Sequence, residues 1–576
     1  MPMKKKPVAR GSPFIRVTRL LVCLLAPCTL WPQVAPLLPG PGGTRPDLPN
    51  FAALRNSPGN ILPVISLPEL PTLDSLFTNI RIPVRDVLIT GSTVLTESEL
   101  DQIAAPYIGK QNSFADLARL RDQLTLAYIQ RGYVSSGAVI PDQSIRDGVV
   151  EIAIMEGKLA AVEVNSNGRL RRRYILGRLE PLRRRVVNVN EVEQALQVLR
   201  QNPRVRGVNA ELAPADMRGE SLLRVEVAEA QARNTVLRFD NYQPLSVGST
   251  RGMADFTHLN ATGRGDTISG AVRFTGGLRA FHFGYTLPLN ARDTVLTLNA
   301  DVARSDVVQS PFQSLDIQSR VETWGLTLLH PLRRAVDSQF DAFVTAEVRR
   351  SQSFLLGSGF RFTDDLTEDG IARVSVVRLG QSWSKSGTGQ ALAMRHSISF
   401  GLSVFGATSN AGNVADSRFV SWLGQAQWAR RVPSLGSGGQ VIIRGDVQLT
   451  NSPLPGLEKF AIGGRATVRG YRENEMVRDN GMVGSVEARI PVLARLGESS
   501  VLELAPFVDV GRSWNKRRPL DEPETLPSAG IGLRWRVRSR LQAEAYWGHA
   551  FRNFPGSKDF NLQDRGIHLG LTWSLP

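Results

Sequence analysis

The stretch IHLGLTWSL, residues 567–575, decides the fold because its alternation is strict. Every second residue of this stretch is apolar: Ile567, Leu569, Leu571, Trp573 and Leu575. The residues between them are polar or small: His568, Gly570, Thr572 and Ser574. Since successive side chains of a strand point to opposite faces, the stretch predicts a strand with one apolar face. Such a strand is typical of a membrane barrel, with lipid on one side and an aqueous lumen on the other.

The same alternation extends upstream. Apolar and polar residues alternate through Leu296, Thr297, Leu298, Asn299, Ala300, Asp301 and Val302. Helical periodicity is absent from Arg233 onward, and the remaining chain accommodates roughly 14–18 strands of about 9–11 residues. We therefore predict a transmembrane β-barrel of antiparallel strands in residues 233–576. A soluble propeller or an array of β-sandwiches stays open as an alternative on alternation alone.

Prolines mark the expected ends of several strands. Pro288, Pro331, Pro433 and Pro491 each follow an apolar or aromatic strand and precede a short link. Proline cannot donate a hydrogen bond to a strand ladder, so it belongs at such ends. Longer polar stretches, such as residues 304–320, are expected to be loops. Short turns at one end and long loops at the other are typical of an outer-membrane barrel.

The N-terminal end has the features of an export signal. Its basic residues, which come before the first acidic residue Asp47, are Lys4, Lys5, Lys6, Arg10, Arg16 and Arg19. The apolar run that follows, residues 20–31, is too short to span a membrane as a helix. Residues 1–35 are therefore predicted to be a signal peptide. Both cysteines, Cys23 and Cys28, lie inside it, so we expect no disulfide in the exported chain.

Residues 36–80 are rich in Pro and Gly and are predicted to be a linker, with room for short helices at residues 51–56 and 73–78. No long apolar run follows Trp31. An exported chain of this kind enters a membrane only as a closed barrel, which satisfies every backbone polar group. The net charge of +16 fits a membrane surface, nucleic acid or an acidic partner and does not choose among them.

Residues 81–158 have the pattern of a compact α+β module. Thr96 with Glu99, and Ser113 with Asp116, are capping-box patterns that predict the starts of two helices. The apolar face of the second helix carries Leu117, Leu120, Leu124 and Tyr128, and Gly132 is placed to end the helix. The alternation of Val150, Ile152 and Ile154 with the residues between them predicts a half-buried strand.

Residues 159–230 repeat this pattern, which predicts a second module of the same kind. Asn190 with Glu193 predicts the start of a helix. The apolar face of that helix holds Val192, Leu196 and Leu199. Two strands are expected to follow, one with Val208, Ala210 and Leu212 and one with Leu223, Val225 and Val227.

No group of residues indicates catalysis. The six histidines form no pair with metal-ligand spacing, so we expect no catalytic residue, no metal site, no cofactor and no enzymatic activity. The segment Gly263-Arg264-Gly265-Asp266 looks like part of a phosphate loop, but no helical pattern follows it. A turn between strands is the better interpretation.

The segment GGRATVRGY, residues 463–471, combines glycine with charge between two expected strands. Downstream, Phe507, Asp509 and Gly511 share one face of a strand, and Val508 and Val510 share the other. If the valines face lipid, Asp509 points into the lumen, where an acid needs water or a partner. Arg469 is a candidate for that partner.

These segments together resemble the two-partner secretion transporters, the TpsB or haemolysin secretion/activation family, which is related to the BamA barrel-assembly proteins. The resemblance runs from about residue 81 to the end. In the barrel it rests on Asp240-Asn241-Tyr242, Gly265-Asp266, Val468-Arg469-Gly470-Tyr471 and Phe507-Val508-Asp509-Val510-Gly511. In the first module it rests on Tyr128-Ile129-Gln130-Arg131-Gly132-Tyr133, Pro141-Asp142-Gln143, Asp147-Gly148 and Glu156-Gly157.

The resemblance implies an outer-membrane barrel of about sixteen strands behind two periplasmic POTRA domains, residues 81–158 and 159–230. It implies that the sixth loop, with Val468, Arg469, Gly470 and Tyr471, folds back into the pore. It also implies that Arg469 pairs with Asp509, in an inner-wall motif that includes Phe507 and Gly511. The candidates for substrate recognition in the first POTRA domain are Leu117, Leu120, Leu124, Tyr128, Arg131, Gly132 and Tyr133.

The implied function is a pore that receives an unfolded exoprotein in the periplasm of a two-membrane bacterium and passes it to the cell surface or medium. The expected partners are the exoprotein, outer-membrane lipid and, during biogenesis, the barrel-assembly machinery, with no nucleic acid. An assembly or insertion factor of the same superfamily is the alternative, and a diffusion porin is a third possibility. The proline-rich residues 36–80 argue against the long plug helix of many family members. The basic clusters at residues 169–173 and 183–185 indicate either attraction of acidic groups or a solvated face.

Overall fold

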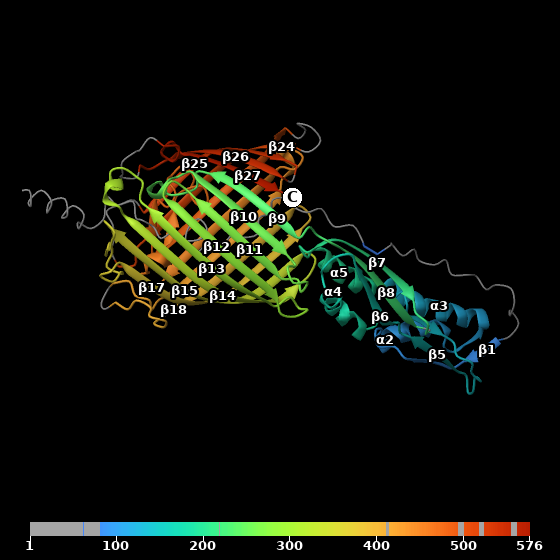
Figure 1. Cartoon of the computed structure of the whole chain (residues 1–576). Helices are drawn as coiled ribbons and strands as arrows, with labels where there is room; N and C mark the ends of the chain where they lie inside the picture. Colours follow the sequence, from blue (N-terminus) through green and yellow to red (C-terminus); the bar gives the residue numbers. More distant parts are fainter. Residues whose placement is uncertain are drawn as a thin grey trace, which may run out of the picture.

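The structure, a computed structural model, describes residues 61–62, 81–217, 219–410, 414–493, 500–517, 524–538, 540–553 and 561–575. Two small α+β modules precede a closed β-barrel, and the second module adjoins one end of the barrel (Figure 1). The predicted signal peptide, and the predicted linker with its short helices, lie outside the described residues except for Ile61 and Leu62. Among the described helices, none is both long and apolar enough to cross a membrane.

The first module packs two helices on a three-stranded sheet of order β2-β5-β4, in which β2 is parallel to β5. Its elements are β1 (Arg81–Val84), β2 (Asp86–Thr90), α2 (Glu97–Ala104), β3 (Lys110–Ser113), α3 (Phe114–Gln130), β4 (Gly137–Val139) and β5 (Val149–Met155). Both predicted capping boxes are present: the side chains of Glu99 and Asp116 accept from the backbone N–H groups of Thr96 and Ser113 at 2.9 and 2.8 Å. These bonds satisfy N–H groups that the first helical turn leaves without a partner.

The second module has the same arrangement, with a sheet of order β6-β8-β7 in which β6 is parallel to β8. Its elements are β6 (Lys158–Ser166), α4 (Arg172–Leu179), α5 (Val189–Arg200), β7 (Val205–Pro214) and β8 (Glu220–Glu229). The predicted cap of its second helix was wrong, because Asn188 and not Asn190 precedes α5. The extended Asn188 accepts from the N–H of Asn190 at 2.9 Å. The expected capping partner Glu193 instead accepts from the N–H groups of Ile61 and Leu62.

The barrel closes on itself through pairing of its first strand, β9, with its last, β27. Its sixteen main strands are β9 (Arg233–Asp240), β10 (Arg251–Leu259), β11 (Thr267–Phe274), β12 (Leu278–Pro288), β13 (Val295–Asp306), β14 (Gln318–Arg334), β15 (Ser338–Leu355), β17 (Ile371–Gly387), β18 (Gln390–Leu402), β19 (Val420–Arg431), β20 (Gln440–Thr450), β23 (Asn480–Leu493), β24 (Ser500–Trp514), β25 (Thr525–Val537), β26 (Leu541–Ala550) and β27 (Ile567–Leu575). All neighbouring main strands are antiparallel, and the two-residue β16 (Ser358–Gly359) is a side pairing on β15. The predicted barrel of about sixteen strands is confirmed, and the propeller and sandwich alternatives are excluded.

The side-chain alternation that predicted the barrel is present in the wall. Leu569, Leu571 and Trp573 are exposed on the outside, whereas His568 between them is fully buried. On β24, Val508 and Val510 are 60% and 48% exposed, while Asp509 is 1% exposed. Asp509 therefore points into the barrel, as the alternation predicted.

The links at the module end of the barrel are short, and most links at the far end are longer. Pro288 and Pro433 lie at strand ends as expected, whereas Pro331 and Pro491 lie at irregularities in the register near the ends of β14 and β23. The prediction that residues 304–320 form a loop was wrong at both ends. β13 continues to Asp306 and β14 begins at Gln318, because strands of 12 and 17 residues extend beyond the lipid layer, where polar side chains are tolerated.

Candidate functional site

The loop between β20 and β23 folds back into the barrel, and we call it loop six (residues 451–479). It contains a small hairpin of β21 (Phe460–Ile462) and β22 (Met476–Arg478), which pair with each other. Phe460, Ile462 and Val468 of the loop form one buried apolar cluster with Val483 and Leu526 of the wall. The glycine-rich segment therefore lies against the inner wall.

Arg469 of loop six and Asp509 of β24 form a two-pronged ion pair. Arg469 Nε donates to Asp509 Oδ2, and Nη2 donates to Oδ1, both at 2.7 Å. The backbone N–H of Arg469 donates to Oδ2 at 3.0 Å. The two side chains are 4% and 0% exposed. A paired guanidinium and carboxylate in such a shielded place fix both the position and the direction of the loop.

Three further side chains complete this ionic cluster, which we call the Arg469 site. Glu487 of β23 forms a second ion pair with Arg469 Nη1. Ser485 donates from Oγ to Asp509 Oδ1 at 2.6 Å and accepts from Arg469 Nη2 at 3.1 Å. The guanidinium carbon lies 3.6 Å from the centre of the Phe507 ring, a cation–π contact.

The other motif residues of loop six fit closely against the wall. Gly470 adopts φ +91°, and a Cβ there would lie 2.9 Å from the backbone of Gly548 on β26. Tyr471 donates from its hydroxyl to the carbonyl of Pro527 at 2.8 Å. Val468 is fully buried and would contact a Cβ at Gly511, which explains why the inner-wall motif ends in glycine.

A second ionic group lies beside the Arg469 site and was missed in the sequence. Arg465 donates from Nε and Nη2 to Glu544 of β26 at 3.1 and 3.0 Å. Arg534 of β25 donates to the same carboxylate at 3.1 Å, and Tyr242 donates to it at 2.9 Å. Each residue is a single charge in an alternating strand or loop, so only the barrel register brings them together.

Loop six has a further attachment on another part of the wall, the Glu458 site. Glu458 is 2% exposed and accepts from Arg378 Nη2 of β17 at 2.9 Å and from Arg349 Nη1 of β15 at 3.2 Å. The strands β18, β19 and β20 separate this place from β23 and β24. Loop six therefore forms ion pairs with two separated parts of the inner wall.

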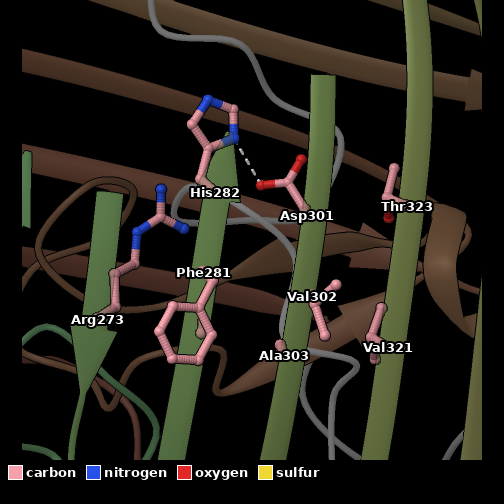
Figure 2. Close-up of a pocket in the computed structure, with 9 residues that line it drawn as sticks. Arg273, Phe281, His282, Asp301, Val302, Ala303, Val321 and Thr323 are labelled. Carbon is pink, nitrogen blue, oxygen red and sulfur yellow. Dashed lines mark hydrogen bonds and ion pairs between the residues drawn. The ribbon is translucent and has the colours of Figure 1, made fainter. Parts of the chain in front are cut away.

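The lumen wall near β12 to β14 is also polar. His282 Nδ1 and Asp301 Oδ1 lie 2.8 Å apart across neighbouring strands, and Figure 2 shows them joined beside Arg273 and Thr323. The adjacent Phe281 belongs to the exposed outer face. An interior lined by charged and polar groups is suited to water or an extended polypeptide.

The second module is attached to the barrel through the turn Gly263-Arg264-Gly265-Asp266. This segment links β10 and β11, so its interpretation as a turn is confirmed. The N–H of Arg171 donates to the carbonyl of Gly263 at 2.9 Å. Gly265 lies against the Tyr174 ring so closely that a Cβ would be 2.3 Å from it. The buried Asp266 accepts from Thr262 at 2.9 Å and holds the turn.

Other contacts of the second module reach the next two turns of the barrel. Asp293, in the turn after β12, forms ion pairs with Arg178 of α4 and Arg334 of β14. Gln201 donates to the carbonyl of Val336 at 2.7 Å. In the basic cluster near residue 170, Arg169 donates to the carbonyl of Ala261 at 3.3 Å, a contact with the barrel that neither interpretation of the cluster predicted. Arg183 and Arg185 pair instead with Glu180 and Glu191 of their own module.

The candidate recognition residues of the first module lie in its core. Leu117, Leu120, Leu124 and Tyr128 are 0–2% exposed and pack on the sheet, so their side chains are not free to contact a substrate. That part of the prediction is corrected, because the apolar face of an amphipathic helix buries itself on the sheet it covers. Tyr133 packs on the same core and meets the Tyr128 ring edge-on.

Arg131 and Gly132 lie at the joint between the two modules. Arg131 forms an ion pair with Glu99 at 2.5 Å, and its carbonyl accepts from Asn188 Nδ2 at 3.0 Å. The carbonyl of Gly132 accepts from the N–H of Val189 at 2.9 Å. A Cβ at Gly132 would lie within 2.7 Å of Asn188 and Asn190 side chains. This segment therefore connects the modules.

Comparison with known proteins also distinguishes the barrel from the first module. The model of the family described as "Haemolysin secretion/activation protein ShlB/FhaC/HecB" matches residues 219–535. The model of the domain described as "POTRA domain, ShlB-type" matches residues 82–157. The chain is 23% identical over 410 residues to "Outer membrane transporter CdiB" of Escherichia coli, covering 69% of this chain and 67% of that protein. It is 22% identical over 418 residues to "Hemolysin transporter protein ShlB" of Serratia marcescens, covering 69% and 70%.

Solved structures agree in fold. CdiB from Escherichia coli superposes with a TM-score of 0.66 at 20% identity, covering 88% of this chain and 93% of that one. CdiB from Acinetobacter baumannii superposes with a TM-score of 0.60 at 19% identity, covering 98% of this chain and 97% of that one. BamA from Haemophilus ducreyi lacking POTRA domains 1–3 superposes with a TM-score of 0.51 at 12% identity, covering 86% of this chain and 100% of that one. The chain belongs to the haemolysin secretion/activation protein ShlB/FhaC/HecB family, as an outer-membrane transporter that moves an exoprotein through its barrel behind periplasmic POTRA domains.

Proposed function

We propose that this chain is the dedicated secretion pore of a two-partner pair, and that loop six is the element that moves when its exoprotein passes. The observation that carries the proposal is the attachment of loop six at the Arg469 and Glu458 sites inside a polar lumen. Ionic contacts suit this task because water or a polar polypeptide can replace them as they separate.

The exoprotein would arrive unfolded and add a strand to a free edge of a POTRA sheet. Within the described residues, β4 and β7 end the two sheets as edge strands. Main-chain hydrogen bonds at such an edge give affinity with little demand on sequence. The buried face of α3 stabilises the sheet that offers the edge, which is the role left to Leu117, Leu120 and Leu124.

Each segment of the chain has a part in the proposed route of the exoprotein. In this proposal residues 1–35 are the signal peptide that directs export, and residues 36–80 are a linker. Residues 81–158 and 159–230 are the two POTRA domains, and residues 233–576 form the pore. The pore performs no catalysis and uses no cofactor, and folding of the exoprotein outside the cell makes transfer directional. Its own insertion depends on the barrel-assembly machinery, and nucleic acid is not among its partners.

Site-specific photocrosslinking to a stalled exoprotein tests this path. A crosslinker replaces Asn299, on the lumen face of β13, and in a matched variant it replaces Leu298, on the lipid face. An exoprotein carrying a tightly folded domain at its trailing end stalls in transit. We expect adducts from position 299 and none from position 298. Equal labelling at both positions, or none at either, would contradict transit through the barrel.

A further inference from the structure

The outer face of the barrel carries an arginine patch at the end away from the modules. It consists of Arg279, Arg304, Arg320, Arg350 and Arg373, one on each of the strands β12, β13, β14, β15 and β17. All five are exposed. Each is an even number of residues from an exposed apolar side chain of its own strand, such as Leu298 for Arg304 and Trp324 for Arg320. They therefore share the face that carries the lipid-facing residues.

Arginines stand opposite one another in this patch. Arg304 is paired across the strands with both Arg279 and Arg320, and Arg350 is paired with Arg373. Like charges placed directly opposite destabilise a sheet. The patch contains Glu322, which pairs with Arg320 at 2.6 Å, and Asp306 lies at its outer edge. Within the described part of the chain, no carboxylate forms an ion pair with Arg279, Arg304, Arg350 or Arg373, so the patch favours an anion from outside.

An apolar groove lies on the same face, directly toward the membrane centre from the patch. Its floor includes the small residues Ala300 and Ala346, and its walls include Phe283, Trp324 and Phe405. Phe405 is 79% exposed and comes from the loop after β18. The floor residues are four positions from Arg304 and Arg350 on their strands, which is about 13 Å. The face thus offers cations at the membrane surface and an apolar channel beneath them.

We propose that the arginine patch and this groove bind a phosphorylated glycolipid of the outer leaflet, of the lipid A class, with its phosphates on the arginines and an acyl chain in the groove. Arginine suits phosphate because its planar fork donates two parallel hydrogen bonds. The five strands span about 19 Å, which is wide for the single phosphate of a phospholipid and fits a sugar headgroup with two phosphates. The site is independent of which exoprotein is secreted.

Binding of purified diphosphoryl lipid A to the full chain in detergent, followed by native mass spectrometry, tests the proposal. The variant Arg304→Gln/Arg350→Gln removes two charges from the patch. The matched control Arg430→Gln/Arg512→Gln removes two outward arginines elsewhere, at the module end of β19 and the far end of β24. We expect the patch variant to weaken binding by about 25-fold, or about fivefold per arginine, and the control to leave it unchanged.

Two further measurements separate the possible sources of binding. Ala346→Trp fills the floor of the groove without changing charge and is expected to weaken lipid A binding as well. Phosphatidylglycerol and dephosphorylated lipid A are expected to bind more weakly than diphosphoryl lipid A. Equal loss in the patch and control variants, or equal binding of phosphatidylglycerol and lipid A, would overturn the proposal. Heat-modifiable migration on gels shows that each variant has a folded barrel.

Discussion

At the scale of residues, the Arg469 site concentrates charge in a place shielded from solvent. Arg469 faces two carboxylates, Asp509 and Glu487, and Arg489 offsets the second through a bond of 2.7 Å to Glu487. Alternation along β24 was enough to predict that Asp509 points inward. Glu487, Arg465 and Glu544 were not predicted, because no pattern in a single strand tells which charge of another strand it meets.

Arg469→Ala is expected to leave the barrel folded and to reduce secretion strongly. Removal of one partner of a buried pair leaves Asp509 and Glu487 without their shared cation, at a cost of about 3–5 kcal/mol, which displaces loop six. The measurement compares exoprotein in the medium with heat-modifiable barrel in the membrane. The double variant Arg469→Ala/Asp509→Ala should lose less stability than the sum of the single variants. Normal secretion by correctly inserted Arg469→Ala would refute the role of this residue.

Gly470→Ala tests how closely loop six approaches the wall. The new Cβ would meet the backbone of Gly548 at 2.9 Å in a left-handed conformation that alanine rarely adopts. We expect secretion to fall and the loop to become more accessible to protease. Gly276→Ala is the control, because no atom lies within 4 Å of its Cβ position. Equal behaviour of the two variants would contradict the close fit.

At the scale of elements, local patterns predicted the helices of the modules well. The capping boxes of α2 and α3 were correct because both partners lie within one turn of chain. The start of α5 was misplaced because Glu193, the expected partner in the cap, binds the backbone of Ile61 and Leu62 instead. The joint at Gly132 was likewise interpreted as a simple helix end, since its contacts with Asn188 come from the other module.

The first module is expected to lose stability in acid. Hydrogen bonds from Arg131 and Thr96 lower the pKa of Glu99 from 4.5 to about 2. Burial acts to raise the pKa of Glu156, but hydrogen bonds from Thr93 and other donors outweigh it and lower the pKa. Since both folded-state pKa values lie below the ordinary value, this stabilisation is complete above the ordinary pKa of 4.5 and is lost as pH falls through the two lowered pKa values.

Hydrogen exchange of the Leu120 and Leu124 amides in the full chain, corrected for the intrinsic rate, measures this effect. The opening free energy should decrease as pH falls below about 4.5, and the decrease should be smaller in Glu99→Gln. Glu97→Gln is the control, because among the described residues Glu97 forms no ion pair. An opening free energy that does not change with pH would show that these carboxylates do not stabilise the module.

Glu458→Gln is expected to loosen the second attachment of loop six. The change removes the charge that Arg349 and Arg378 share while it keeps nearly the same shape. In planar bilayers, the variant should show larger or more frequent conductance steps than the unmodified chain. Glu368→Gln serves as a control in an exposed loop, where the carboxylate pairs only with Arg361 among the described residues. Identical conductance in all three proteins would mean that the Glu458 site does not hold the loop in the pore.

At the scale of the whole molecule, the barrel was predictable because apolar and polar residues alternate in many strands, and each of these strands independently indicates a membrane barrel. Sixteen strands close through β9 and β27, within the range that chain length allowed. The position of the second module on the turns after β10 and β12 was not predictable. It depends on single contacts such as Gly265 with Tyr174 and Asp293 with Arg178, which lie far apart in the sequence.

The measurement that tests the central claim most directly compares the proteins of the culture medium and of the outer membrane with and without this chain. A dedicated secretion pore predicts that one or a few large proteins disappear from the medium while the other outer-membrane barrels keep their amounts. Reintroduction of the chain should restore secretion. A general fall in outer-membrane barrels would contradict the account and indicate an assembly factor, and no change in either fraction would leave only a diffusion pore.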